Sequence, residues 1–172
     1  AVSKGPIESV ELLIAKGADL NARDENGNTL LHIAVKRGIK DIVKLLIINS
    51  ASLNAKNKDG LTPLHCALSH MSNRKNDKTR RGITELLIIA GANIEICDKY
   101  GATALHYAAV EGEIDLVKLL LAHGADIKAK TTEGDTALHD AVYSGEIDVA
   151  KLFITNGADI NAEDSIGNTP LH

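Results

Sequence analysis

Apolar residues recur along the chain in pairs of short segments with helical spacing. In one pair, the first segment carries Leu31, Ala34 and Val35, and the second is the leucine-rich run at residues 42–47. Intervals of three and four residues place such side chains on one face of a helix. A helix of about 8–10 residues is too short to be stable alone and must cover its apolar face with a neighbour. The pattern therefore predicts stacked pairs of short helices.

Residue types that favour helix ends mark the limits of these segments. Thr29 precedes the first helix of a pair, where its hydroxyl accepts an otherwise unpaired backbone N–H. Pro63 and Pro170 each follow a Thr at the first helical position, where a missing N–H costs nothing. Gly38 follows the first helix and is expected to adopt a left-handed backbone. These signals predict where the first helix of each pair begins and ends.

The same unit returns along the whole chain. Histidines stand at positions 32, 65, 106, 139 and 172, with intervals of 33, 41, 33 and 33 residues. Each histidine closes a block such as DKYGATALH at residues 98–106, and each second helix is followed by a block such as GAD at residues 124–126. A period of this size indicates a repeat protein.

These blocks resemble the ankyrin repeat, whose pattern is D-x-x-G-x-T-P-L-H-x-A-A-x-x-G, a leucine-rich helix and then G-A-D-x-N-A. The resemblance implies an α solenoid of stacked helix–turn–helix repeats joined by β-hairpin-like loops. It makes residues 1–172 a single array with a partial repeat at each end, so we expect an internal segment of a longer array. The expected units are residues 1–23 (partial), 24–56, 57–97, 98–130, 131–163 and 164–172 (partial).

Two residues depart from the repeat in an informative way. Ser50 stands where the other repeats have the Gly of the GAD block, and a left-handed backbone at Ser50 would cost about 1 kcal/mol. Asp140 stands at the position that Ile33, Cys66 and Tyr107 occupy in the other repeats. The sequence offers no explanation for a carboxylate at this apolar or aromatic position.

The composition excludes several classes of protein. Trp is absent and aromatic residues make up only 2% of the chain, so a large aromatic cofactor pocket is not expected. A net charge of −4 and a pI near 6.0 argue against general nucleic-acid binding. No apolar run approaches the roughly 18 residues that a membrane span needs. Two cysteines give no disulfide framework, so we expect a cytoplasmic protein. We also expect no cofactor and no small-molecule substrate.

The seven histidines suggest a metal or catalytic hypothesis, but the repeat accounts for five of them. We expect each repeat histidine to form hydrogen bonds with its own Thr or with nearby hairpin backbone. His70 and His123 lack a Cys, an Asp or a second His at ligand spacing, so no metal site is expected. Cys66 aligns with apolar residues and should be buried, whereas Cys97 lies in a loop, with a reactive thiol as the alternative. We therefore expect no enzymatic activity.

The resemblance implies that partners contact the hairpin tips and the ends of the first helices, which form a concave groove. We expect a protein–protein interaction scaffold, with a substrate-recruiting or inhibitory segment of a larger enzyme or secreted effector as the alternative. Tyr100, Val110 and Tyr143 are predicted to cluster there as a hot spot, the alternative being exposed residues without a partner. The predicted partner-binding residues are Lys36, Arg37, Lys58, Leu61, His70, Tyr100, Val110, Glu111, Glu133 and Tyr143.

The repeat at residues 57–97 contains 8 more residues than the others, between its two helices. The insertion carries five basic residues and one acid, Asp77, a local charge of +4. A basic loop suits an acidic partner, an anionic lipid surface, RNA or an import receptor, with a solvated loop as the alternative. Its basic residues are Arg74, Lys75, Lys78, Arg80 and Arg81.

Charge is also uneven along the array. Residues 1–97 have 14 basic and 10 acidic side chains, a net of +4, whereas residues 98–172 have 5 basic and 13 acidic side chains, a net of −8. We expect a monomer, with salt-sensitive head-to-tail association as the alternative. Nucleic-acid binding is not expected, because Tyr100 beside Lys99 is the only candidate for base stacking next to a cation.

Two further expectations come from the resemblance. The segments that end at Asn21 and Asn161 look like sites that asparaginyl hydroxylases modify in ankyrin repeats. Abundant Ile, Lys and Asn resemble the ankyrin arrays of intracellular bacteria, for which the host cytosol is the alternative location.

Overall fold

The computed structural model describes residues 5–69 and 77–172. Within these residues the chain forms nine helices, and a single isolated bridge between Lys130 and Thr136 is the only β pairing. The helices are α1 (Gly5–Ala15), α2 (Leu30–Lys36), α3 (Lys40–Ile48), α4 (Pro63–Leu68), α5 (Asp77–Ile89), α6 (Ala104–Val110), α7 (Ile114–Ala122), α8 (Ala137–Tyr143) and α9 (Ile147–Thr155).

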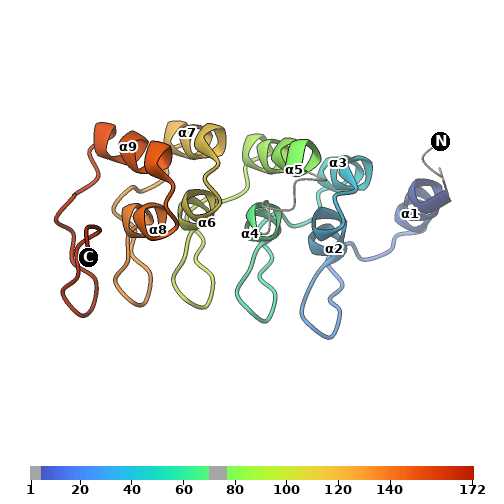
Figure 1. The fold of residues 1–172 in the computed structure, drawn as a ribbon. Helices are drawn as coiled ribbons and strands as arrows, with labels where there is room; N and C mark the ends of the chain where they lie inside the picture. The colour runs from blue at the N-terminus through green and yellow to red at the C-terminus, as the bar shows by residue number, and fades with distance from the viewer. Residues whose placement is uncertain (1–4, 70–76) are drawn as a thin grey trace.

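The helices form two layers that run the length of an elongated array (Figure 1). The inner layer is α2, α4, α6 and α8, and the outer layer is α1, α3, α5, α7 and α9. Each helix packs on the next member of its own layer, and each inner helix packs on the outer helix that follows it. Long loops project from the inner layer, on the side away from the outer layer (Figure 1). The predicted α solenoid of stacked helix pairs is confirmed.

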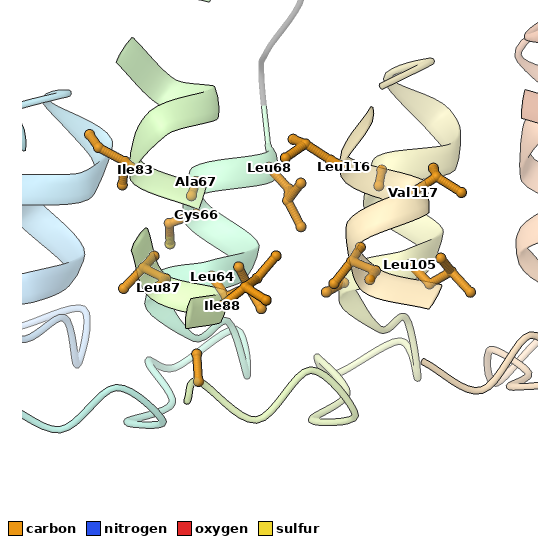
Figure 2. Close-up of a cluster of buried hydrophobic side chains, with 14 of the residues drawn as sticks. Leu64, Cys66, Ala67, Leu68, Ile83, Leu87, Ile88, Leu105, Leu116 and Val117 are labelled. Atoms are coloured by element: carbon orange, nitrogen blue, oxygen red, sulfur yellow. The ribbon is translucent and has the colours of Figure 1, made fainter. Parts of the chain in front are cut away.

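One continuous apolar core lies between the two layers. Figure 2 shows Leu64 of α4 beside Leu87 and Ile88 of α5, and all three side chains are buried. Small residues such as Ala108 are also buried and let inner helices approach closely. Cys66 is buried as predicted, and burial raises the pKa of its thiol to about 11 because an apolar site disfavours the thiolate.

A row of buried histidines joins each repeat to the next. In the first full repeat, the Thr29 backbone N–H donates to His32 Nδ1 over 3.1 Å. A backbone N–H can only donate, so Nδ1 is the acceptor and Nε2 carries the proton. His32 Nε2 then donates to the Leu61 carbonyl of the following hairpin over 3.0 Å. The prediction that the repeat histidines bond to their Thr and to hairpin backbone is confirmed.

His65, His106 and His139 keep this pattern, even across the long repeat, whereas His172 is exposed and bonds to Thr169 of its own block. His65 Nε2 donates to the Ala102 carbonyl, 37 residues away, whereas His32 and its acceptor Leu61 are 29 residues apart. The difference equals the 8 inserted residues, so the insertion leaves the contact between successive repeats unchanged. His106 donates to the Asp135 carbonyl and His139 to the Asn168 carbonyl, each over 3.3 Å.

The hairpins stack backbone to backbone. The Lys99 N–H donates to the Asp59 carbonyl over 3.1 Å, and the Thr132 N–H donates to the Tyr100 carbonyl over 2.8 Å. Gly101 lies at this contact with a φ of 79°, and a Cβ there would lie 2.8 Å from the Thr132 nitrogen. Two features therefore require glycine at this position: the left-handed backbone and the close approach of the next hairpin.

The backbone agrees with most of the helix-end predictions. Gly38 has a φ of 67°, and Ser50 has a φ of 61°, so Ser50 adopts the left-handed conformation that its glycine counterparts take. Pro63 begins α4 as predicted. At Pro170, residues 169–172 form a turn that is closed by the hydrogen bond from the His172 N–H to the Thr169 carbonyl.

Acidification from about pH 7.5 to about pH 5.5 should destabilise the wild-type protein more than a His32→Gln variant. Burial first, and then nearby Lys36 and Arg23, hold the pKa of His32 below its ordinary value of 6.5. Neutral His32 therefore contributes its full stabilisation above pH 6.5. This contribution is lost as the pH falls from 6.5 toward the pKa of His32 in the folded protein, because the unfolded chain binds more protons than the folded chain in that range. Urea-unfolding midpoints at both pH values measure the difference. His123→Gln, at an exposed site, is the control, and equal pH dependence in all three proteins would contradict this account.

Candidate functional site

The inner helices and the hairpins enclose a row of three hollows that together form one groove. The first hollow, about 380 Å³, is lined by Lys36, Leu61, Cys66, Ser69 and Arg80. The middle hollow, about 460 Å³, includes Leu61, Ser69, Tyr100, Tyr107, Val110 and Asp140. The third hollow, about 520 Å³, includes Glu133, Asp135, Asp140, Tyr143 and Asp164. Leu61 and Ser69 line the first two hollows and Asp140 lines the last two, so the groove is continuous.

The middle hollow brings together two of the three residues of the predicted hot spot. Tyr100 comes from a hairpin tip and Val110 from the end of α6, and the two side chains are 62% and 46% exposed. Tyr143, at the end of α8, lines the third hollow instead and is 96% exposed. Tyr143 therefore lines a neighbouring hollow, and that the three residues act as one hot spot stays a prediction.

The remaining predicted partner-binding residues fall into three groups. Leu61 and Glu111 line the middle hollow, Lys36 the first and Glu133 the third. Arg37 and Lys58 are exposed but line none of these three hollows. His70 lies outside the described residues.

The hairpin tip at the mouth of the middle hollow is held by charged contacts. Lys99 Nζ lies 2.6 Å from the Asp59 carboxylate of the preceding hairpin and 5.0 Å from the centre of the Tyr100 ring. The hydrogen bond from Lys99, and then its charge, hold the pKa of Asp59 below its ordinary value. Both side chains are well exposed, so this pair orients the tip more than it stabilises the fold.

Tyr107 and Asp98 form a closed polar network at the floor of the middle hollow. The Tyr107 hydroxyl donates to Asp98 Oδ2 over 2.9 Å, and the other carboxylate oxygen accepts the backbone N–H groups of Tyr100 and Ala102. The Tyr107 ring also meets the His65 imidazole edge-on, with ring centres 5.3 Å apart. Burial, followed by the Asp98 hydrogen bond, raises the pKa of Tyr107. The Asp98 carboxylate is therefore fully engaged by its own repeat.

Asp140 is the groove residue that sequence reasoning did not assign to the site. It lies on α8, partly buried, and within the described part of the chain its carboxylate forms neither a hydrogen bond nor an ion pair. Burial, helped by the nearby charge of Asp135, raises its pKa from 3.8 to about 7. The sequence did show that Asp140 is unusual, because it is a carboxylate at an apolar position of the repeat. The repeat pattern alone did not show that this position borders the groove.

The basic insertion is partly structural. α5 begins at Asp77 and has 13 residues, four more than the 9 of α3, so part of the insertion forms an extra helical turn. Arg80 donates to the backbone carbonyls of Ser69 and Lys36 over 3.0 and 3.3 Å. These carbonyls lie at the ends of inner helices α4 and α2, so Arg80 ties the extra turn to the inner layer.

Arg81 links neighbouring repeats. Its guanidinium lies 2.8 Å from the Glu113 carboxylate and 3.0 Å from the Asp115 carboxylate, both at the start of α7. Among the other predicted insertion residues, Lys78 is exposed, whereas Arg74 and Lys75 lie outside the described residues. Arg80 and Arg81 therefore link the extra turn to neighbouring helices, and docking of a partner by the basic insertion stays a prediction.

Replacing Arg81 with alanine should lower the free energy of unfolding by about 1–2 kcal/mol, because two carboxylates at the start of α7 lose a shared cation and the arginine stem loses its packing. Chemical denaturation measures the change. Lys78→Ala removes the same charge from an exposed position of the same helix and should change stability by less than about 0.5 kcal/mol. Equal effects of the two substitutions would show that Arg81 does not link α5 to α7.

Replacing Asp140 with asparagine should stabilise the protein by about 1–2 kcal/mol at about pH 8, because the partly buried carboxylate is ionised there without a protein partner. The pKa of folded Asp140 is raised, so ionisation costs stability progressively as the pH rises from 3.8 to about 7. The gain should therefore be smaller at about pH 5, which denaturation at both pH values tests. Asp148→Asn, at an exposed position of α9, is the control and should show no such gain. A stability gain that does not grow with pH would contradict burial of the charge.

The two predicted hydroxylation sites lie in exposed loops. Asn21 Oδ1 accepts the backbone N–H of Ser52 over 2.9 Å and so links successive loops. The Asn161 backbone N–H donates to the Asp159 side chain over 2.9 Å. Hydroxylation at either residue stays a prediction.

Residues 5–69 and 77–172 contain no group of three or more His, Cys, Asp or Glu side chains placed to hold a metal ion. None of the helices in these ranges is both long enough and apolar enough to cross a membrane.

Comparison with known proteins agrees with the repeat architecture. A family model described as ankyrin repeats (3 copies) matches residues 1–79 and 75–164. These two matches cover nearly the whole array, including the three hollows up to Asp164. No curated protein matches the chain.

Proposed function

Because this chain belongs to the ankyrin repeat family, whose repeats are generally protein–protein interaction modules, we propose that it binds a partner protein in the groove of three hollows. The observation that carries the proposal is the exposed apolar surface of the middle hollow. Tyr100 and Val110 both line this hollow of about 460 Å³ and keep much of their apolar surface exposed in the free protein. A tyrosine of this kind is a typical interface anchor, since it buries a large area while losing little side-chain freedom.

The charge of the groove changes along its length and supports a directional mode of binding. The first hollow presents Lys36 and Arg80, whereas the third presents Glu133, Asp135 and Asp164. A partner segment that is acidic at one end and basic at the other would match this polarity in one orientation only. Such complementarity accelerates association and selects against reversed binding.

The test begins with affinity capture of a partner from a lysate, with nuclease added to remove nucleic-acid bridging. Calorimetry with the purified partner should then show that Tyr100→Ala weakens binding by about tenfold or more, because truncation of an interface anchor removes its buried contact. Tyr143→Ala should weaken binding by a smaller factor, since Tyr143 lies in the third hollow. Ile89→Ala changes an exposed apolar residue on the outer layer and is the matched control. A partner that binds all four proteins equally would show that the groove is not its site.

A further inference from the structure

We propose that the middle hollow receives a lysine or arginine side chain of the partner, with its aliphatic stem against Tyr100 and Val110 and its charge on the Asp140 carboxylate. This inference rests on the proposed function, because it specifies the chemistry of the segment that the groove binds. It commits to a protein segment with one basic residue at a fixed position.

The shape of the middle hollow suits a long amphipathic side chain. Its volume of about 460 Å³ exceeds what a single side chain needs, and Leu61, Tyr100 and Val110 contribute apolar groups to its lining. Lysine and arginine both combine an apolar stem with a charged end, and they bury the stem along apolar surface. The same lining includes Asp140 of α8, so the stem and the charge of one basic residue would both find complementary groups in this hollow.

The charge of the middle hollow is one-sided. Its lining contains the carboxylates of Asp98, Glu111 and Asp140, and among the described residues no lysine or arginine lines it. Lys99 lies between Asp98 and Tyr100 of the lining in the sequence, and it is paired with Asp59 at the hairpin tip. His106 also lines the hollow, but burial lowers its pKa and so favours the neutral imidazole. Arg80 lines the first hollow and donates to the carbonyl of Ser69, which lines both hollows. A cationic side chain in the middle hollow would therefore meet a lining that carries negative charge alone.

Asp140 is the carboxylate of this hollow that is available to a partner. Asp98 accepts hydrogen bonds from Tyr107 and from two backbone N–H groups, whereas the Asp140 carboxylate accepts none from the described residues. Burial makes its ionised form costly in the free protein, and a bound cation would offset this cost. The corresponding positions on α2, α4 and α6 are Ile33, Cys66 and Tyr107, so a carboxylate at this position is confined to α8.

The experiment selects random dodecapeptides displayed on phage against the wild-type protein and measures the affinity of the best peptides by fluorescence polarisation. The peptides are expected to share one lysine or arginine, and replacing an arginine with citrulline should weaken binding about tenfold, because citrulline keeps the shape and loses the charge. Asp140→Asn should weaken binding by a similar factor and abolish the difference between arginine and citrulline. Asp148→Asn removes the same charge from the outer layer and should leave the affinity unchanged.

The outcomes separate this inference from the proposed function. Peptides that require Tyr100 but share no basic residue, or that bind Asp140→Asn as tightly as wild type, would overturn the basic-residue site and leave the groove as an interface. Peptides whose affinity is unaffected by Tyr100→Ala would overturn both proposals. Loss of arginine preference in Asp140→Asn alone, with folding verified by its urea-unfolding midpoint, would establish the contact.

Discussion

The hydrogen bond from each buried histidine to the following hairpin is the contact on which the array depends. An imidazole that accepts from a Thr backbone N–H and donates to a carbonyl of the next repeat, as His32 does to Leu61, satisfies two buried backbone groups at once. A buried polar group without a partner would cost about 1–3 kcal/mol, so the histidine fixes where the next hairpin must lie. The neutral imidazole is required, because a second ring proton would remove the acceptor.

This constraint explains how the array accommodates its insertion. The contact from His65 to the Ala102 carbonyl spans 8 more residues than the contact from His32, yet it keeps the same partners in the repeat. The extra residues are displaced to the junction between α4 and α5, where one additional helical turn forms. Arg80 and Arg81 then anchor that turn to the inner layer and to α7. In a solenoid each repeat contacts only its neighbours, so such a change remains local.

The groove is a consequence of the same regular stacking. Inner helices and hairpins recur at a constant offset, and the hollows between them differ only in the side chains that each repeat supplies. Tyr100 and Val110 give the middle hollow an apolar mouth, and Asp140 gives it an ionisable wall. A partly buried carboxylate without a protein partner is typical of a site where binding and stability have opposite requirements.

The sequence by itself determined the repeat period, the helix ends, the left-handed backbone of Gly38 and Ser50, and the role of the histidines, because each depends on neighbours close in the chain or on the repeat itself. Only the tertiary structure decided which side chains share a hollow. It placed Tyr143 in the lining of a different hollow from Val110, and it engaged Arg81 with a carboxylate 32 residues away. It also showed the surroundings of Asp140. The environment of a side chain is set by residues of adjacent repeats, whose identities vary while the backbone that carries them stays constant.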